Sequence, residues 1–168
     1  MKNLQELVLH RCDFINSGAG ISHFTMKPYT PNTINKLVLK RCVLDRSHLN
    51  ELVDVFPNLE ELEIDLSNGI PGYAYDCRFE IETLKTDLDN LGKLKNLRVV
   101  KLTDLYEGDG DDDAYTIYHI EMALESIRDN FHINTEVEIS IPVGLTGKLK
   151  AVLFKKRGLE PAFQDFTI

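Results

Sequence analysis

The sequence predicts an α/β solenoid, with about six short parallel strands on a concave face and helices and loops on the convex face. A twelve-residue pattern occurs twice near the start, as NLQELVLHRCDF from position 3 and TINKLVLKRCVL from position 33. The two copies place apolar residues at identical offsets and share an Arg-Cys pair. Weaker copies follow at intervals of 25 to 38 residues. Self-similarity at such periods is typical of repeat proteins, so we expect one domain over residues 1–168.

The strands are predicted where apolar residues alternate inside each copy, because alternate residues of a strand point to opposite faces of a sheet. The inward positions are Leu7 and Leu9; Leu37 and Leu39; Leu62 and Ile64; Val100 and Leu102; Val137 and Ile139; and Phe166 and Ile168, with Phe163 at the first apolar position of the last copy. Six parallel strands are therefore expected, with the last one at the end of the sequence.

Four helices are predicted in the segments between the strands, from apolar residues at helical spacing. They are a helix through Leu49, Leu52, Val53 and Phe56 after a cap at Asp45; one through Leu84, Leu88 and Leu91; one over about 114–131; and a basic helix from Thr146 or Gly147 to Gly158. The apolar stripe of each helix is expected to pack against the sheet, since short helices are marginal without such burial.

Composition excludes several classes of protein. Apolar residues make up 43% and charged residues 27% of the 168, as in ordinary globular domains. No apolar run is long enough to cross a bilayer, and we find neither a secretory signal nor an Asn-x-Ser/Thr sequon. The net charge of −8 argues against a nucleic-acid partner, which needs a basic face. We therefore expect a cytoplasmic or nuclear protein with no membrane partner.

The three cysteines predict packing rather than a disulfide framework or a metal site. Cys12 and Cys42 occupy equivalent repeat positions, where a small side chain is expected to be buried beneath the strand. Cys77 lies outside the repeat pattern. No cofactor is expected.

An acidic loop, residues 107–113, carries five carboxylates and is the one candidate ion site. Asp109, Asp111 and Asp113 have the alternating offsets of the first three ligands of an EF-hand. The sixth position, which needs glycine, is Ala114, and the twelfth, which needs an acidic residue, is Ile120. Only a weak ion site is therefore predicted, and because no catalytic motif is present we do not expect an enzyme.

The repeat pattern LxxLxLxxC resembles the cysteine-containing leucine-rich repeats of F-box proteins, the substrate receptors of cullin-based ubiquitin ligases. The later copies depart from that pattern, with Ser67, Leu105 and Pro142 at the cysteine position. The resemblance implies a repeat domain that holds a protein substrate. It also implies that a ubiquitin-ligase adaptor would bind through sequence not present here. Because solenoid ends normally carry capping elements and neither end of this sequence shows room for one, we expect the chain to be part of a longer array or to associate through an end.

Three functions stay open at this point. The first is a non-catalytic protein-binding scaffold, such as the substrate-recognition part of an F-box-like receptor. The second is a structural or regulatory subunit that stacks on another chain, or on itself end to end, through a solenoid end. The third and most remote is an enzyme that uses the acidic loop with a divalent metal ion.

The expected binding surface is the concave face, formed by the strand residues that alternate with the buried ones. Its charged or polar members are Glu6 and His10; Lys36 and Lys40; Glu61, Glu63 and Asp65; Lys101; and Glu136 and Glu138. We expect Lys36 to lie beside Glu61 and Lys40 beside Asp65, with Glu136 and Glu138 unpaired. The excess of carboxylates predicts a partner with a basic segment.

Overall fold

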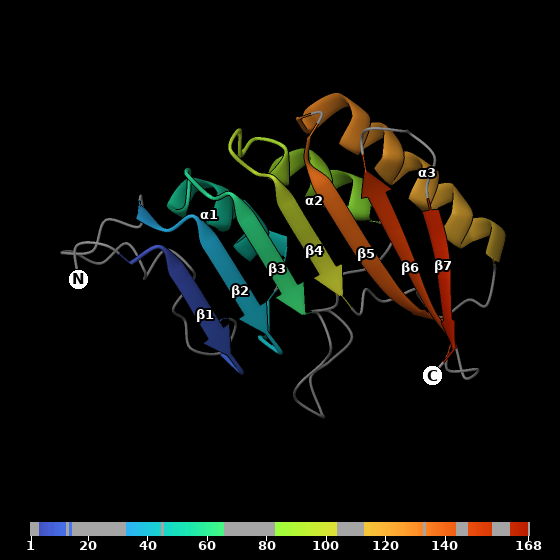
Figure 1. Ribbon diagram of the computed structural model, residues 1–168, viewed down its shortest axis with the longest axis horizontal. Helices are drawn as coiled ribbons and strands as arrows, with labels where there is room; N and C mark the ends of the chain where they lie inside the picture. Colours follow the sequence, from blue (N-terminus) through green and yellow to red (C-terminus); the bar gives the residue numbers. More distant parts are fainter. Residues whose placement is uncertain are drawn as a thin grey trace.

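The computed structural model describes residues 4–12, 14, 33–44, 46–65, 83–103, 113–132, 134–143, 148–155 and 162–167. These residues form an open α/β fold, with one seven-stranded sheet whose spatial order follows the sequence (Figure 1). The strands are β1 (Glu6–His10), β2 (Lys36–Lys40), β3 (Glu61–Asp65), β4 (Val99–Thr103), β5 (Glu136–Val143), β6 (Lys148–Lys155) and β7 (Ala162–Thr167).

Strands β1 to β5 are parallel, and their alignment follows the predicted repeat. Leu37, for example, lies opposite Leu7 on one side and opposite Leu62 on the other. The prediction of six parallel strands is wrong in its last member. The final strand, β7, is separated from β5 by β6, and β6 is antiparallel to both neighbours.

Helices α1 (Arg46–Val55), α2 (Leu84–Leu91) and α3 (Asp113–Asn130) connect the parallel strands and lie together on one side of the sheet (Figure 1). They confirm three of the predicted helices. The cap expected at Asp45 lies outside the described residues.

The basic helix predicted from Thr146 or Gly147 to Gly158 is wrong, because residues 148–155 form β6. This segment contains Val152 and Phe154, which favour strands. Only four residues, 144–147, separate β5 from β6 in sequence, a length common in hairpins. Pairing with both β5 and β7 therefore prevails over the helical spacing of the apolar residues.

The repeat extends to backbone hydrogen bonds where each strand begins. The carbonyl of Gln5 accepts from the amides of Asn35 and Lys36, at 2.9 and 3.1 Å. The carbonyl of Asn35 accepts in the same way from two successive amides that lead into β3, and the carbonyl of Glu60 from two that lead into β4. Neighbouring parallel strands are thus joined by one recurring local geometry.

The core lies between the parallel strands and the three helices. Its sheet side consists of the predicted inward residues of β2 to β5, and Leu52, Leu88 and Ile127 are among its helix residues. The expectation that Cys12 and Cys42 are fully buried is wrong. Both are free thiols that remain partly exposed at the edge of this core.

Candidate functional site

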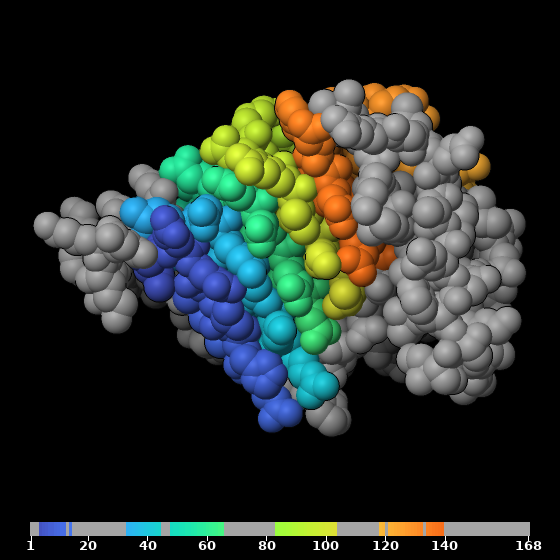
Figure 2. Space-filling view, in the orientation of Figure 1, coloured from blue at the N-terminus to red at the C-terminus, as the bar shows by residue number. Residues whose placement is uncertain are grey.

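The side of the parallel sheet opposite the helices carries the residues predicted for binding. We call this surface the open face and define it by the alternating residues of β1 to β5. These are Glu6, Val8 and His10; Lys36, Val38 and Lys40; Glu61, Glu63 and Asp65; Val99, Lys101 and Thr103; and Glu136 and Glu138. Figure 2 shows these strands side by side across that surface. The parallel register brings the predicted residues onto one continuous surface.

Lys36 lies between two carboxylates from neighbouring strands. Its ammonium is 3.2 Å from Glu6 and 3.7 Å from Glu61, and the three side chains are 39% to 53% exposed. The hydrogen bond with Glu6 is the main reason that the pKa of Lys36 is raised above its ordinary value. The expected pairing of Lys36 with Glu61 is confirmed. Because these groups are so exposed, each pair contributes little to stability and is available for exchange with a partner.

Lys40 and Lys101 pair with carboxylates on adjacent strands. Lys40 lies opposite Asp65 in the register, as predicted, while its ammonium lies 3.8 Å from Glu63 on the diagonal. Lys101 contacts Glu138 at 3.1 Å, and this hydrogen bond raises the pKa of Lys101. The prediction that Glu138 is unpaired is therefore wrong.

A shallow hollow of about 200 Å³ lies on the open face across β2, β3 and β4. Lys36, Glu61, Glu63 and Lys101 contribute charge to its lining. Val38 and Val99 are its apolar side chains on this face; Val38 is only 4% exposed, so the accessible apolar surface comes mainly from the partly exposed Val99. An apolar position on this face was detectable from the sequence, since Leu37, Val38 and Leu39 are consecutive apolar residues. Charged walls around an apolar patch suit the aliphatic stem and charged head of a lysine or arginine.

The charge of the open face is unbalanced. Its lysines are Lys36, Lys40 and Lys101, whereas its carboxylates are Glu6, Glu61, Glu63, Asp65, Glu136 and Glu138. Lys36, Lys40 and Lys101 each have a carboxylate within 4 Å, so their charges are already neutralised. The remaining negative charge favours a basic partner.

A second pocket, of about 430 Å³, lies where β4 and β5 begin, and it was not predicted from the sequence. Its lining consists of Glu60, Lys95, Asn96, Leu97, Arg98, His132, Asn134 and Thr135. The Arg98 guanidinium lies 3.8 Å from Glu60, and His132 Nδ1 accepts from the Asn134 amide at 3.3 Å. These residues come from the segments that precede three strands, β3, β4 and β5, which is why no local motif marks them.

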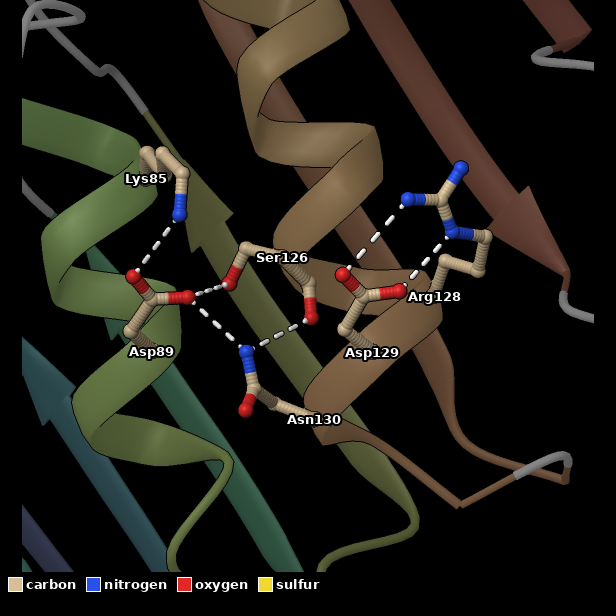
Figure 3. Close-up of polar contacts among 6 residues, drawn as sticks. All are labelled: Lys85, Asp89, Ser126, Arg128, Asp129 and Asn130. Carbon is tan, nitrogen blue, oxygen red and sulfur yellow. Dashed lines mark hydrogen bonds and ion pairs between the residues drawn. The ribbon is translucent and has the colours of Figure 1, made fainter.

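A polar cluster joins α2 to α3 on the helical side (Figure 3). Asp89 accepts hydrogen bonds from Lys85 at 3.0 Å, Ser126 at 2.6 Å and Asn130 at 2.8 Å. Burial raises the pKa of Asp89, but the hydrogen bonds from Ser126 and Lys85 outweigh burial and lower it below its ordinary value. A carboxylate with a lowered pKa is a weak base, so it is poorly suited to activate the Ser126 hydroxyl. The cluster instead fixes one helix against the other.

The ion site proposed for the acidic loop cannot be placed as a whole. Asp109 and Asp111 lie outside the described residues, and Asp113 is the first residue of α3. Among the residues that the structure describes, no three His, Cys, Asp or Glu side chains could together hold a metal ion. In the same residues, no helix combines the length and apolar character needed to cross a membrane.

Comparison with protein-family models, curated proteins and solved structures finds no match for this chain. Its class is therefore defined by the fold alone, as an α/β protein with an open sheet that contains five parallel strands.

Proposed function

We propose that this chain is a leucine-rich-repeat-like solenoid that binds another protein on its open face and has no catalytic activity of its own. The observation that carries the proposal is the arrangement of charged side chains, in register, on the side of the parallel sheet away from the helices. The recurring backbone geometry supports the solenoid interpretation, because each strand is joined to the next in the same way.

The favoured partner offers a basic segment in an extended or helical form. Long-range attraction to the excess carboxylates would speed its association. A lysine or arginine of the partner could place its stem on Val99 and its charge beside Glu61 or Glu63. Since Lys36 and Lys40 already pair with these two carboxylates, binding exchanges internal ion pairs for intermolecular ones.

The receptor hypothesis adds that the bound protein is a substrate for ubiquitin transfer. It rests on the resemblance of the two best repeats and requires a ligase adaptor to bind elsewhere on the full protein. Co-purification of such an adaptor with the full protein would support this extension. A constant stoichiometric partner without an adaptor would favour a regulatory subunit instead.

The test is the double variant Glu61→Lys, Glu63→Lys. Proteins captured from a cell extract by the wild-type chain are identified, and the main one is purified for titration against both chains. We expect the variant to lose at least tenfold in affinity, because two favourable contacts become repulsive ones. Its thermal unfolding should stay close to that of the wild type, since the two side chains are 50% and 40% exposed and their ion pairs contribute little to stability.

The matched control reverses two charges on the helical side, Glu121→Lys with Glu125→Lys, where both residues are exposed on α3. This control changes the net charge equally and should retain the affinity. Unchanged binding by the open-face variant would refute the proposed site. Loss of binding only when Asp111, Asp112 and Asp113 are changed would move the site to the acidic loop.

A further inference from the structure

Among the residues that the structure describes, strand β1 is the first strand of the sheet, and β2 is its one strand neighbour. The carbonyl of Gln5 and the amide of Arg11 bond toward β2, with Lys36 and Lys40 respectively. In a parallel strand, alternate residues direct their amide and carbonyl groups to opposite sides. Glu6, Val8 and His10 therefore direct theirs away from β2, along an edge that can pair with another strand.

Apolar exposure is concentrated at this edge. The exposed large apolar side chains of the described residues are Leu4 (40%), Val8 (53%) and Tyr118 (56%), and two of these belong to β1 or the residues just before it. Leu7 and Leu9 are only partly buried, whereas their counterparts Leu37 and Leu39 in β2 are each 1% exposed. Another strand beside β1 would cover these residues.

We infer that β1 is a self-association site, at which β1 of a second copy pairs antiparallel with Val8 on the two-fold axis. The outward backbone groups of Glu6 then pair with those of His10 of the second copy, and those of His10 with Glu6. The outward groups of the two Val8 residues pair with each other. Each of the three residues donates one backbone hydrogen bond and accepts one. The open faces of both copies come to lie on the same side of one continuous sheet.

The side chains of β1 favour a second copy over an unrelated strand. On the open face, Val8 meets Val8 of the other copy, and Glu6 meets His10 in both directions. Glu6 already contacts Lys36, but its side chain is 53% exposed and can accept from a histidine as well. On the other face, Leu7 lies opposite Leu9 of the second copy, which covers the partly buried leucines. The strand is thus complementary to itself in this one register.

Contact through a five-residue strand is small, so we expect a weak dimer with a dissociation constant on the order of 100 µM. Sedimentation equilibrium of the wild-type chain from about 10 µM to 1 mM should follow a monomer–dimer isotherm. Hydrogen exchange at both concentrations provides the structural readout. The amides of Glu6, Val8 and His10 should exchange more slowly at the high concentration, while the amides of β3 should not change.

Two substitutions at Val8 test the pairing. Val8→Pro removes an outward amide and leaves the bonds to β2 in place, a situation in which edge strands tolerate proline. Val8→Lys keeps the amide but places two like charges on the two-fold axis. Both variants should stay monomeric up to 1 mM. Tyr118→Lys is the matched control, because it removes a similarly exposed apolar residue from α3, and it should dimerise like the wild type.

A charge exchange tests the register. His10→Glu alone places carboxylates opposite one another and should weaken the dimer several-fold. Adding Glu6→Lys restores opposite charges and should recover the wild-type constant. A chain that is monomeric at 1 mM would overturn the inference. A dimer that persists in both Val8 variants, or slower exchange at high concentration only outside β1, would place the contact elsewhere and overturn it equally.

Discussion

Strands β1 and β2 carry the same sequence pattern and the same backbone geometry, yet they differ in burial. In both copies an Arg-Cys pair follows the strand, and both arginines have positive φ, 56° for Arg11 and 53° for Arg41. Leu37 and Leu39 of β2 are almost completely buried, whereas Leu7 and Leu9 of β1 are not. The pattern determines the conformation of each copy, and the neighbouring copies determine how much each side chain stabilises the fold.

The largest expected difference between the two strands concerns their second inward leucine. Leu39→Ala should lower the free energy of unfolding by about 3 kcal/mol, because it leaves a cavity in the packed core. Leu9→Ala should lower it by only about 1 kcal/mol, since part of that side chain is already in water. Urea denaturation at about 5 µM protein measures both values, when the dependence of the unfolding free energy on urea concentration is held the same for all variants.

Equal losses for the two variants would contradict this expectation and would mean that β1 is covered as completely as β2. Raising the protein concentration to about 1 mM sharpens the test. If β1 pairs with a second copy, the loss caused by Leu9→Ala should grow with concentration, while the loss caused by Leu39→Ala should not.

The cysteines that follow the two strands should differ in their rate of chemical modification. This difference is smaller than that between the leucines, and again the residue after β2 is the better protected one. The Cys42 thiol lies 3.6 Å from the carbonyl of Lys40 in its own copy and also 3.7 Å from the carbonyl of Leu9 in the preceding copy, and burial raises its pKa. Cys12 donates to the carbonyl of His10 within its own copy, at 3.9 Å. At pH 8, iodoacetamide should therefore modify Cys42 several-fold more slowly than Cys12, because the thiolate is the reactive form.

The rates are measured one thiol at a time, in a Cys77→Ser background with either Cys12→Ser or Cys42→Ser. Unfolding in urea should make the two rates equal, which controls for local sequence. Faster modification of Cys42 in the native protein would show that the preceding copy does not protect it.

Sequence patterns were enough to predict the fold in the part of the chain where each copy resembles the next. The register of β1 to β5 and the three helices followed from apolar residues alone, because each copy buries the same positions against the same neighbours. The pattern failed at residues 148–155, where helical spacing and strand propensity coexist in one segment. The long-range pairing of β6 with both β5 and β7 decides between them.

The open face was predictable to the level of residues but not of contacts. Alternation placed Glu63 and Glu138 on this face, but the register alone did not show that Lys40 would reach diagonally to Glu63 or that Lys101 would bind Glu138. The contact of Asp89 with Ser126 was also missed, because it depends on how α2 and α3 cross. No spacing within either helix carries that information.

The smallest expected change in the free energy of unfolding concerns the arginine after each strand, and it should be the same in both copies. Positive φ is unfavourable for arginine and is tolerated better by asparagine, so Arg11→Asn and Arg41→Asn should each raise the free energy of unfolding by about 0.5 kcal/mol. Both side chains are exposed, and the substitution keeps the amide with which Arg11 bonds to Lys40. The gain is measured from urea denaturation midpoints of paired samples.

Arg98→Asn is the control, because Arg98 lacks a positive φ and its side chain pairs weakly with Glu60. This substitution should give no gain. Equal gains at Arg11 and Arg41 would mean that the turn after each strand is set locally, by residues common to both copies. A gain in the free energy of unfolding at Arg41 alone would mean instead that the turn depends on a preceding copy, as burial does. The two strands would then differ in conformational preference as well as in packing.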